Sequence, residues 1–505
     1  MSSNPRTSGV VLPIFSLPGP YGIGTLGRHA YRFIDFLQAS GQSWWQVLPL
    51  TPTGYGDSPY QSPSSLAGNP YLIDLERLID KGLLLPDECE ASDCGGNPDK
   101  IDYGLLYLNR LPLLRLAFER GKKKLSGKLS DKLSAFRRAH AHWLPDYALF
   151  MAAKERFGMV ALDDWPDPDL RARVPSAVKA YEKELAEDIA FHEFIQYCFF
   201  TQWRALKYYA NWRGIRLIGD MPIYVSSDSV ERWTRPDLFL LDEDGAPSVV
   251  AGVPPDCFTE TGQLWGNPLY DWEEHARTGY SWWLSRMAHM ADCFDMVRID
   301  HFLGFYRYWA VPVDAETAET GCYHPGPDMT FVDAVRNTFP DLPLIAEDLG
   351  NLDDDACAFF KKAGFPGMNV LIYAFDPNGD NPYLPHNAAP DRVLYTSTHD
   401  APSFLEWLTC EASPEEQAFA TDYLALRADE GLSWGAIRSA WASTAGIAMA
   451  PLQDVLGLGA DARINIPATL GGNNWRWRVR TEAINDNVAE RLRRLTWVFR
   501  RLGNG

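Results

Sequence analysis

Short apolar runs that end in polar or acidic residues recur along the chain. These runs are Ser43–Pro49, Ile215–Val225, Asp295–His301, Leu344–Gly350, Gly367–Phe375, Arg392–Asp400 and Arg463–Pro467. Such short runs are typical of parallel strands that are covered on both faces. Helical patterns lie between most of them, among them Thr278–Cys293, Asp353–Ala363 and Ser413–Asp429. The alternation predicts a parallel α/β fold.

Acidic residues stand at or near the C-terminal ends of several predicted strands. In a (β/α)8 TIM barrel, active-site groups collect at that end of the strands, so we predict this fold. A doubly wound open sheet is the alternative. It is weakened because no G-x-G-x-x-G motif opens a helix after the first strand.

Two long segments interrupt the alternation. Residues 75–200 show long amphipathic helical patterns, at Gly104–Arg120, Asp131–His142, Asp146–Phe157 and Pro175–Trp203. Residues 226–280 are rich in Pro, Gly, Asp and Trp and have little periodicity. We therefore expect one catalytic barrel over residues 1–505, with a mostly helical insertion subdomain at 75–200. We expect a loop-rich insertion at 226–280, over an active site at the C-terminal face of the barrel.

Composition narrows the choice of ligand. The chain has 505 residues with 46% hydrophobic and 22% charged residues, which excludes a disordered protein. Its formal net charge of −19 argues against a nucleic-acid or anionic-membrane partner, because both require a basic surface. Aromatic residues make up 13% of the chain, and some of them could stack on sugars, although we expect most to lie in the core.

The eight cysteines include no C-x-x-C pair, which disfavours a zinc ribbon or a redox motif. The start of the chain has no apolar region of signal-peptide length, and no run of about 18 apolar residues occurs. We therefore expect a reducing compartment, most simply the cytoplasm.

The strongest local signal is the segment DMVRIDHFLGF, residues 295–305. Side chains alternate along a strand, so Arg298 and Asp300 point to the same face, which can be the barrel interior. A buried carboxylate beside a guanidinium stays ionised, as a carboxylate nucleophile requires. The alternative is a purely structural Arg–Asp pair.

A second signal is IAEDLG, residues 345–350. The adjacent acids Glu347 and Asp348 point in opposite directions, so one could face the barrel mouth while the other caps the next helix. Glu347 follows an apolar run, and partial desolvation would raise its pKa, as a general acid needs. Capping of the helix by both acids is an equal alternative.

A third signal is YTSTHD, residues 395–400. His399 and Asp400 at a strand end could bind a sugar diol or begin a metal site. We favour the sugar, because the ten histidines of the chain are widely dispersed. Ser–His–Asp catalysis has little support, since no G-x-S-x-G motif is present.

Three carboxylates at the ends of separate strands, Asp300, Glu347 and Asp400, indicate glycosyl transfer. Their order, R-x-D, then E, then H-D, resembles that of the α-glucan-active clan of retaining glycosidases and transglycosidases. Within this clan the chain resembles the 4-α-glucanotransferase family, also called amylomaltase or disproportionating enzyme. The stretches that carry the resemblance are Gly56–Asp74, Gly219–Val225, Gly252–Tyr270 and Arg463–Arg478.

The resemblance implies a role for each site residue. Asp300 would be the nucleophile, Glu347 the general acid and then the general base, and Asp400 the group that stabilises the transition state. Further residues would orient the nucleophile or contact the glucan: Arg298, His301, His399, Asp220, Tyr60, Phe258, Trp265 and Asn465. The resemblance calls for no metal and no cofactor.

The chain departs from the family pattern at a few positions. Leu303 stands where Arg is more frequent in the family, and Ala401-Pro402-Ser403 stands where Asn-Asp-Thr is more frequent. Ala468 stands where Gly is more frequent, and Cys257 stands where Tyr is more frequent. None of these changes removes a catalytic carboxylate.

The expected function is therefore transfer of α-1,4-glucan segments to the 4-hydroxyl of an acceptor glucan or glucose by a retaining double displacement. Two alternatives stay open. One is an α-glucan hydrolase, and the other is a catalytically inactive carbohydrate-binding or regulatory protein on the same barrel.

Overall fold

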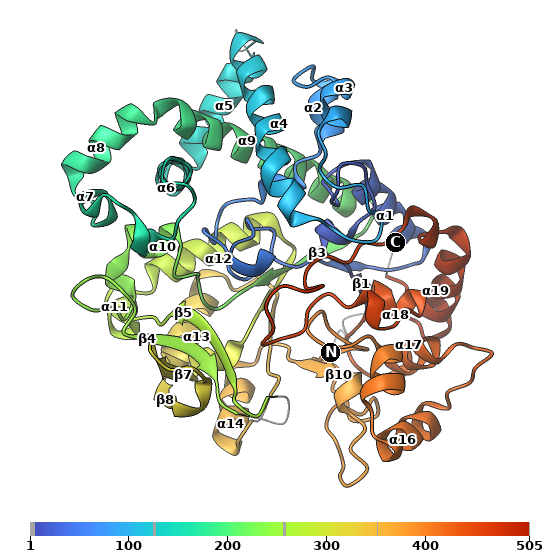
Figure 1. Cartoon of the computed structure of the whole chain (residues 1–505). Helices are drawn as coiled ribbons and strands as arrows, with labels where there is room; N and C mark the ends of the chain where they lie inside the picture. The colour runs from blue at the N-terminus through green and yellow to red at the C-terminus, as the bar shows by residue number, and fades with distance from the viewer. Residues whose placement is uncertain (1–5, 125–127, 256–258, 351, 504–505) are drawn as a thin grey trace.

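The centre of the molecule is a sheet of eight parallel strands. In the computed structural model, which describes residues 6–124, 128–255, 259–350 and 352–503, this sheet is surrounded by helices (Figure 1). The strands are β1 (Thr7–Val11), β2 (Trp44–Gln46), β3 (Arg216–Met221), β6 (Met296–Ile299), β9 (Leu344–Ala346), β10 (Met368–Val370), β11 (Val393–Tyr395) and β12 (Ile447–Pro451).

Except for β9 and β10, each strand of this sheet pairs in parallel with the next strand of the sheet along the chain, and β12 pairs with β1. The edges of the ladder are β9 and β10. Across this seam the Ala346 N–H donates to the Pro366 carbonyl (2.8 Å), and the Met368 N–H donates to the Asp348 carboxylate (2.7 Å). The predicted (β/α)8 barrel is therefore confirmed, with one seam bridged by few hydrogen bonds.

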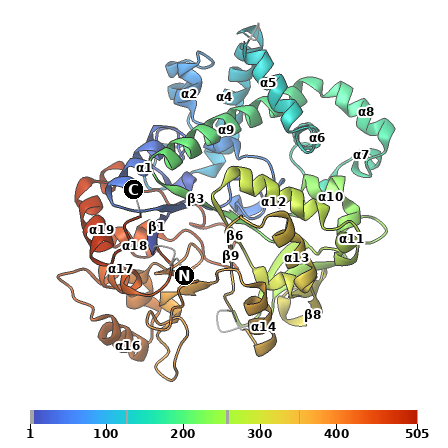
Figure 2. The same cartoon turned by 180° about the vertical axis from the view of Figure 1, so that it is seen from behind.

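Helices follow the strands and cover the outside of the barrel (Figure 2). They are α1 (Arg28–Ala39), α9 (Ala186–Trp212), α12 (Ser281–Cys293), α13 (Asp328–Thr338), α14 (Asp354–Ala363), α15 (Phe404–Glu406), α16 (Pro414–Leu424), α17 (Leu432–Ala442), α18 (Leu452–Leu456) and α19 (Asp486–Val498). The sequence sets their ends locally. In α14, the Asp353 side chain accepts the Ala356 N–H at the start, and Gly364 adopts the left-handed conformation at the end.

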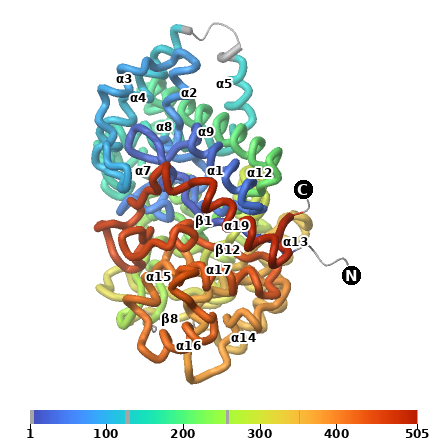
Figure 3. Tube along the Cα trace, turned by 90° about the vertical axis from the view of Figure 1, so that its right-hand side faces the viewer, coloured from blue at the N-terminus to red at the C-terminus, as the bar shows by residue number. Residues whose placement is uncertain are grey.

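Further helices precede α9 and gather at one end of the molecule (top of Figures 1 and 3). They are α2 (Leu75–Asp80), α3 (Pro86–Ala91), α4 (Tyr103–Lys124), α5 (Lys128–Ala139), α6 (Leu144–Arg156), α7 (Pro168–Arg171) and α8 (Pro175–Glu184). A distinct subdomain over residues 75–200 stays a prediction. Its C-terminal boundary falls inside α9, which continues to Trp212 just before β3.

Residues 226–280 contain short elements. These are α10 (Val230–Thr234), β4 (Val249–Val253), β5 (Gln263–Pro268) and α11 (Trp272–Arg277). Strands β4 and β5 join β7 (Arg307–Pro312) and β8 (Cys322–Pro325) in a second, antiparallel sheet. The pairing of β4 with β5 shifts register between Val250 and Gly252, which interrupts the alternation that a regular strand shows in sequence.

For the barrel sheet, the strand predictions contain one error and two omissions, and the strands of the second sheet were not predicted either. Arg463–Pro467 forms no strand: a 3-10 turn precedes it, the Arg463 side chain binds Glu406 of α15, and the Asn465 side chain binds Asp400. Strands β1 and β12 were not predicted, because Gly9 and the alanines of β12 have low β-propensity. A side chain at Gly9 would lie 2.5 Å from the Cβ of Trp44, so the close approach of β1 to β2 requires glycine.

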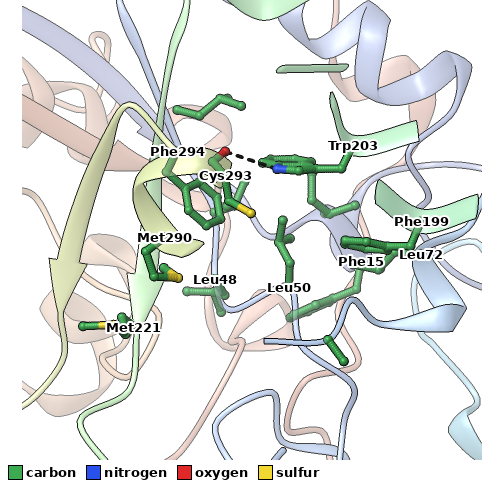
Figure 4. Packing of buried hydrophobic residues seen from close by; sticks show 14 of the residues in the cluster. Phe15, Leu48, Leu50, Leu72, Phe199, Trp203, Met221, Met290, Cys293 and Phe294 are labelled. Atoms are coloured by element: carbon green, nitrogen blue, oxygen red, sulfur yellow. Dashed lines mark hydrogen bonds between the residues drawn. The ribbon is translucent and has the colours of Figure 1, made fainter. Parts of the chain in front are cut away.

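The hydrophobic core between barrel and helices is closely packed (Figure 4). Trp203 of α9 lies beside Cys293, where α12 ends, and its indole donates to the Cys293 carbonyl (3.2 Å), while Phe199 of α9 lies beside Phe15 and Leu72. Within the described residues, no helix combines the length and apolar character that crossing a bilayer requires.

Candidate active site

The predicted carboxylates of the site come from the C-terminal ends of separate barrel strands. Asp220 lies near the end of β3, directly opposite Arg298 of β6 in the ladder. Asp300 follows β6, and Glu347 follows β9. Because parallel strands end at the same rim of a barrel, residues far apart in sequence meet there.

Arg298 holds two carboxylates at once. Its guanidinium Nη1 lies 2.8 and 2.9 Å from the Asp220 oxygens and 2.9 Å from Oδ1 of Asp300. Arg298 and Asp220 are almost fully buried, whereas the Asp300 side chain keeps 25% of its exposure and is open to a ligand. Although burial disfavours its charge, Asp220 and Asp300 hold the pKa of Arg298 well above its usual value.

Asp300 is ionised near neutral pH, but not because its pKa is low. Burial raises its pKa to about 6, and Arg298 opposes this rise only in part. The physical reason is that one guanidinium is shared with Asp220, whose negative charge also raises the pKa of Asp300.

Glu347 is held by backbone groups. Its carboxylate accepts the N–H of His301 (2.6 Å) and the N–H of Leu349 (3.0 Å). His301 has the left-handed conformation (φ 51°, ψ 50°), an uncommon one for a residue other than glycine. Burial raises the pKa of Glu347 to about 7; the charge of Asp300 adds to the rise, while Arg298 and the two N–H groups oppose it. The group is therefore partly protonated at neutral pH.

Asp348 caps no helix. Besides the Met368 N–H, it binds the Arg392 guanidinium, whose Nη2 lies 3.1 Å from its Oδ1. The following helix is capped by Asp353 instead. Capping by both acids is thereby excluded, and Glu347 is left at the barrel mouth.

Asp400 is paired with a histidine and an amide. His399 Nε2 lies 2.9 Å from its Oδ2, and the Asn465 amide donates to its Oδ1 (2.7 Å). Although burial raises the pKa of Asp400, these partners hold it lower, at about 2. Burial disfavours protonation of His399, but the Asp400 charge outweighs it and raises the pKa of His399. Asp400 is thus a fixed negative charge, and His399 is its partner.

Tyr60 joins two parts of the site. Its hydroxyl donates to Oδ2 of Asp220 (2.9 Å) and lies 2.8 Å from Nε2 of His399. Its ring stacks on the His399 ring with a centroid distance of 5.5 Å and an interplanar angle of 7°. Tyr60 therefore fixes both neighbours.

Trp265 contacts the site residue His301. The two rings meet edge to face at 4.9 Å, and burial lowers the pKa of His301 to about 4, so this imidazole is neutral. Gln61 ties the loop of Tyr60 to the Trp265 carbonyl (3.1 Å). Phe258 lies outside the described residues.

Two aromatic residues of the site were not predicted individually. Trp475 lies 5.7 Å from Tyr60 and 6.4 Å from His399, measured between ring centroids. It belongs to the N-W-R-W-R motif, which was a usable signal. The other is Tyr373, whose pKa burial raises, with the charge of Asp400 adding to the rise.

Among the departures from the family pattern, Ala468 has a structural consequence. Its backbone has φ of 59°, the left-handed region that favours glycine. Leu303 and Ala401 are buried, while Ala468 is exposed. In the portion of the chain that the structure covers, no group of three or more His, Cys, Asp or Glu side chains has an arrangement that could hold a metal ion.

Comparison with known proteins gives one consistent family. A family model described as 4-alpha-glucanotransferase matches residues 12–484. The 4-alpha-glucanotransferase of Thermus thermophilus is 46% identical over 505 residues (99% of each chain), and that of Clostridium butyricum is 43% identical over 489 residues (97% of this chain, 99% of the relative).

A solved structure agrees over nearly the whole length. The amylomaltase from Streptococcus agalactiae in complex with acarbose superposes with a TM-score of 0.95 at 41% identity, covering 98% of this chain and 99% of that one. The resemblance that the sequence motifs indicated is thereby confirmed. The chain belongs to the 4-alpha-glucanotransferase family.

Proposed function

We propose that the chain transfers α-1,4-glucan segments to the 4-hydroxyl of an acceptor glucan or glucose, by a retaining double displacement. The observation that carries this proposal is the pair of Asp300, held beside Arg298, and Glu347, which is partly protonated at neutral pH. A nucleophilic carboxylate and an acid with a raised pKa are the two groups that the reaction needs. Membership of the family and the acarbose complex of the relative support an α-glucan as substrate.

In the first step, the Asp300 carboxylate attacks the anomeric carbon while Glu347 protonates the departing glycosidic oxygen. An ester bond forms to Asp300, the glycosidic bond breaks, and Glu347 becomes a carboxylate. The fixed charge of Asp400 binds the sugar hydroxyls, and these hydrogen bonds strengthen as the ring becomes oxocarbenium-like.

In the second step, Glu347 takes the proton from the acceptor 4-hydroxyl. The acceptor oxygen attacks the anomeric carbon, the ester to Asp300 breaks, and both carboxyl groups regain their starting states. Two inversions give net retention. The shift of the Glu347 pKa toward neutrality suits a group that gives and then takes one proton.

Incubation with maltotriose tests transfer directly. Transfer redistributes glucose units into shorter and longer products while total reducing ends stay constant; a steady rise in reducing ends would instead establish hydrolysis. Asp300→Asn should abolish turnover, whereas the matched change Asp355→Asn, on the exposed face of α14, should leave it intact. A chain that binds maltotriose but never converts it would establish the inactive binding protein.

The setting of the reaction is part of the proposal. We propose a cytoplasmic location, where a reducing environment keeps the eight cysteines as thiols. We also propose that the chain has no nucleic-acid partner, because its net charge is −19. Cell fractionation and a nucleic-acid retention assay test the two points.

A further inference from the structure

The loop that carries His399 and Asp400 is tied at both ends by one side chain. This loop starts at Thr396, just after β11, and ends at Phe404, the first residue of α15. Asp454, in α18, accepts hydrogen bonds from the Thr396 hydroxyl with Oδ2 and from the Phe404 N–H with Oδ1 (2.7 Å). One carboxyl group thus joins residues eight positions apart on either side of Asp400.

The surroundings of this side chain are dry. Asp454 and Thr396 have no exposed surface, and Phe404 is equally buried. Burial raises the pKa of Asp454 to about 6, and the two hydrogen bonds oppose the rise. Burying a carboxyl group is costly unless it is hydrogen-bonded, so an apolar residue would serve better for packing alone.

Neighbouring contacts fix the same loop from the same side. The Thr396 N–H donates to the Met449 carbonyl of β12 (3.0 Å), which places the start of the loop in the sheet. The Ser403 hydroxyl donates to the Leu458 carbonyl (2.7 Å), just beyond α18. β12 and the segment that follows it therefore hold both ends of the loop.

We propose that Asp454 is a positioning residue, which sets the depth of Asp400 in the site by clamping both ends of its loop. The proposal rests on the proposed function. Asp400 itself is oriented by His399 of the same loop and by Asn465 of another segment, but these contacts fix its carboxylate group, while Asp454 fixes the backbone that carries it. A displacement of about 1 Å at a catalytic group can cost about 10²-fold in rate.

The test compares kcat and KM for maltotriose transfer across matched variants. Asp454→Ala removes both hydrogen bonds and should lower kcat about tenfold to a hundredfold, with KM within about threefold. Thr396→Val removes only the hydroxyl and should lower kcat less. Thr396→Ser keeps the hydroxyl and should restore most of the activity that Thr396→Val loses.

Asp454→Asn separates geometry from charge. The amide can accept the Phe404 N–H and donate to the Thr396 oxygen, so kcat should stay within about threefold of the unaltered chain. A loss as large as that of Asp454→Ala would overturn positioning by hydrogen bonds. Asp422→Ala, an exposed change in α16, serves as the control.

A purely structural role predicts another pattern. It would lower the melting temperature and the folded fraction but leave kcat per folded molecule unchanged, and that result for Asp454→Ala would refute the proposal. If Asp454→Ala does not fold, Thr396→Val decides, since unaltered kcat there also refutes it. Failure of the proposed function is distinguishable, because the unaltered chain would then show no transfer at all.

Discussion

The pH dependence of kcat/KM follows from the two carboxyl groups of the double displacement. The active form needs Asp300 ionised and Glu347 protonated, and their pKa values are about 6 and about 7. Activity is therefore lost below pH 6, as Asp300 gains a proton, and above pH 7, as Glu347 loses one. At pH 6.5 roughly 60% of the molecules are in the active form, and about 3% are at pH 4.5 or 8.5. A bell-shaped profile with a fall of roughly 20-fold over two pH units on each side is expected.

The assay separates the two limbs by changing the leaving group. Initial rates at low donor concentration are measured from pH 4.5 to 8.5 with maltotriose and with an α-maltosyl fluoride. Fluoride departs without a proton, so the alkaline limb should disappear for the fluoride donor, while the acid limb should stay. Asp355→Asn serves as the control and should keep the full bell.

Two outcomes would refute this reasoning. An alkaline limb that persists with the fluoride donor would show that Glu347 is not the acid of the first step. A profile that falls continuously from pH 5 to 8, with no acid limb in that range, would show that burial does not shift these groups as described, since unshifted carboxyls titrate near pH 4.

Other substitutions test further parts of the structure. Arg298→Lys should lower kcat at least tenfold, because one ammonium group cannot hold two carboxylates in the same geometry; steady-state kinetics decide, and unchanged kcat would contradict the bridging role. Gly367→Ala places a Cβ 1.9 Å from the Arg392 guanidinium, so it should lower both kcat and the melting temperature; wild-type values of both would contradict the close approach. Ala468→Gly should raise the free energy of unfolding by about 1 kcal/mol by removing left-handed strain, as measured by urea denaturation. A decrease in the free energy of unfolding would show that alanine, by restricting the unfolded chain, stabilises the protein more than its left-handed strain destabilises it.

The sequence predicted the fold correctly where strands are buried on both faces. Such strands appear as apolar runs, and the acidic residues that end them mark the barrel rim. The omissions have a local cause: Gly9 in β1 and the alanines of β12 are dictated by close neighbours rather than by β-propensity. The Arg463–Pro467 error has the opposite cause, since a strand-like run there lacks a partner strand.

For the active site, the sequence allowed predictions only from single motifs. The motifs predicted which carboxylates matter, because each follows a strand. They could not predict that Arg298 is shared by two carboxylates, so the raised pKa of Asp300 was not foreseen. Asp454 stands far from Asp400 in sequence, and its link to that loop depends on how α18 packs. Such contacts between distant segments need the three-dimensional structure.

The seam of the barrel gives the strands that precede Asp300 and Glu347 different backbone surroundings. Asp300 follows β6, which pairs with a strand on each side, whereas Glu347 follows β9, at the edge where the ladder ends. The strand that carries the nucleophile is thus held by backbone ladders on both sides. The strand that carries the proton donor has a backbone ladder on one side only, and on its other side the Ala346 N–H and the Asp348 carboxylate bridge the seam. Separation of the strands at this seam therefore breaks fewer backbone hydrogen bonds than separation of β6 from β9, whose ladder keeps the segments of the nucleophile and the proton donor together.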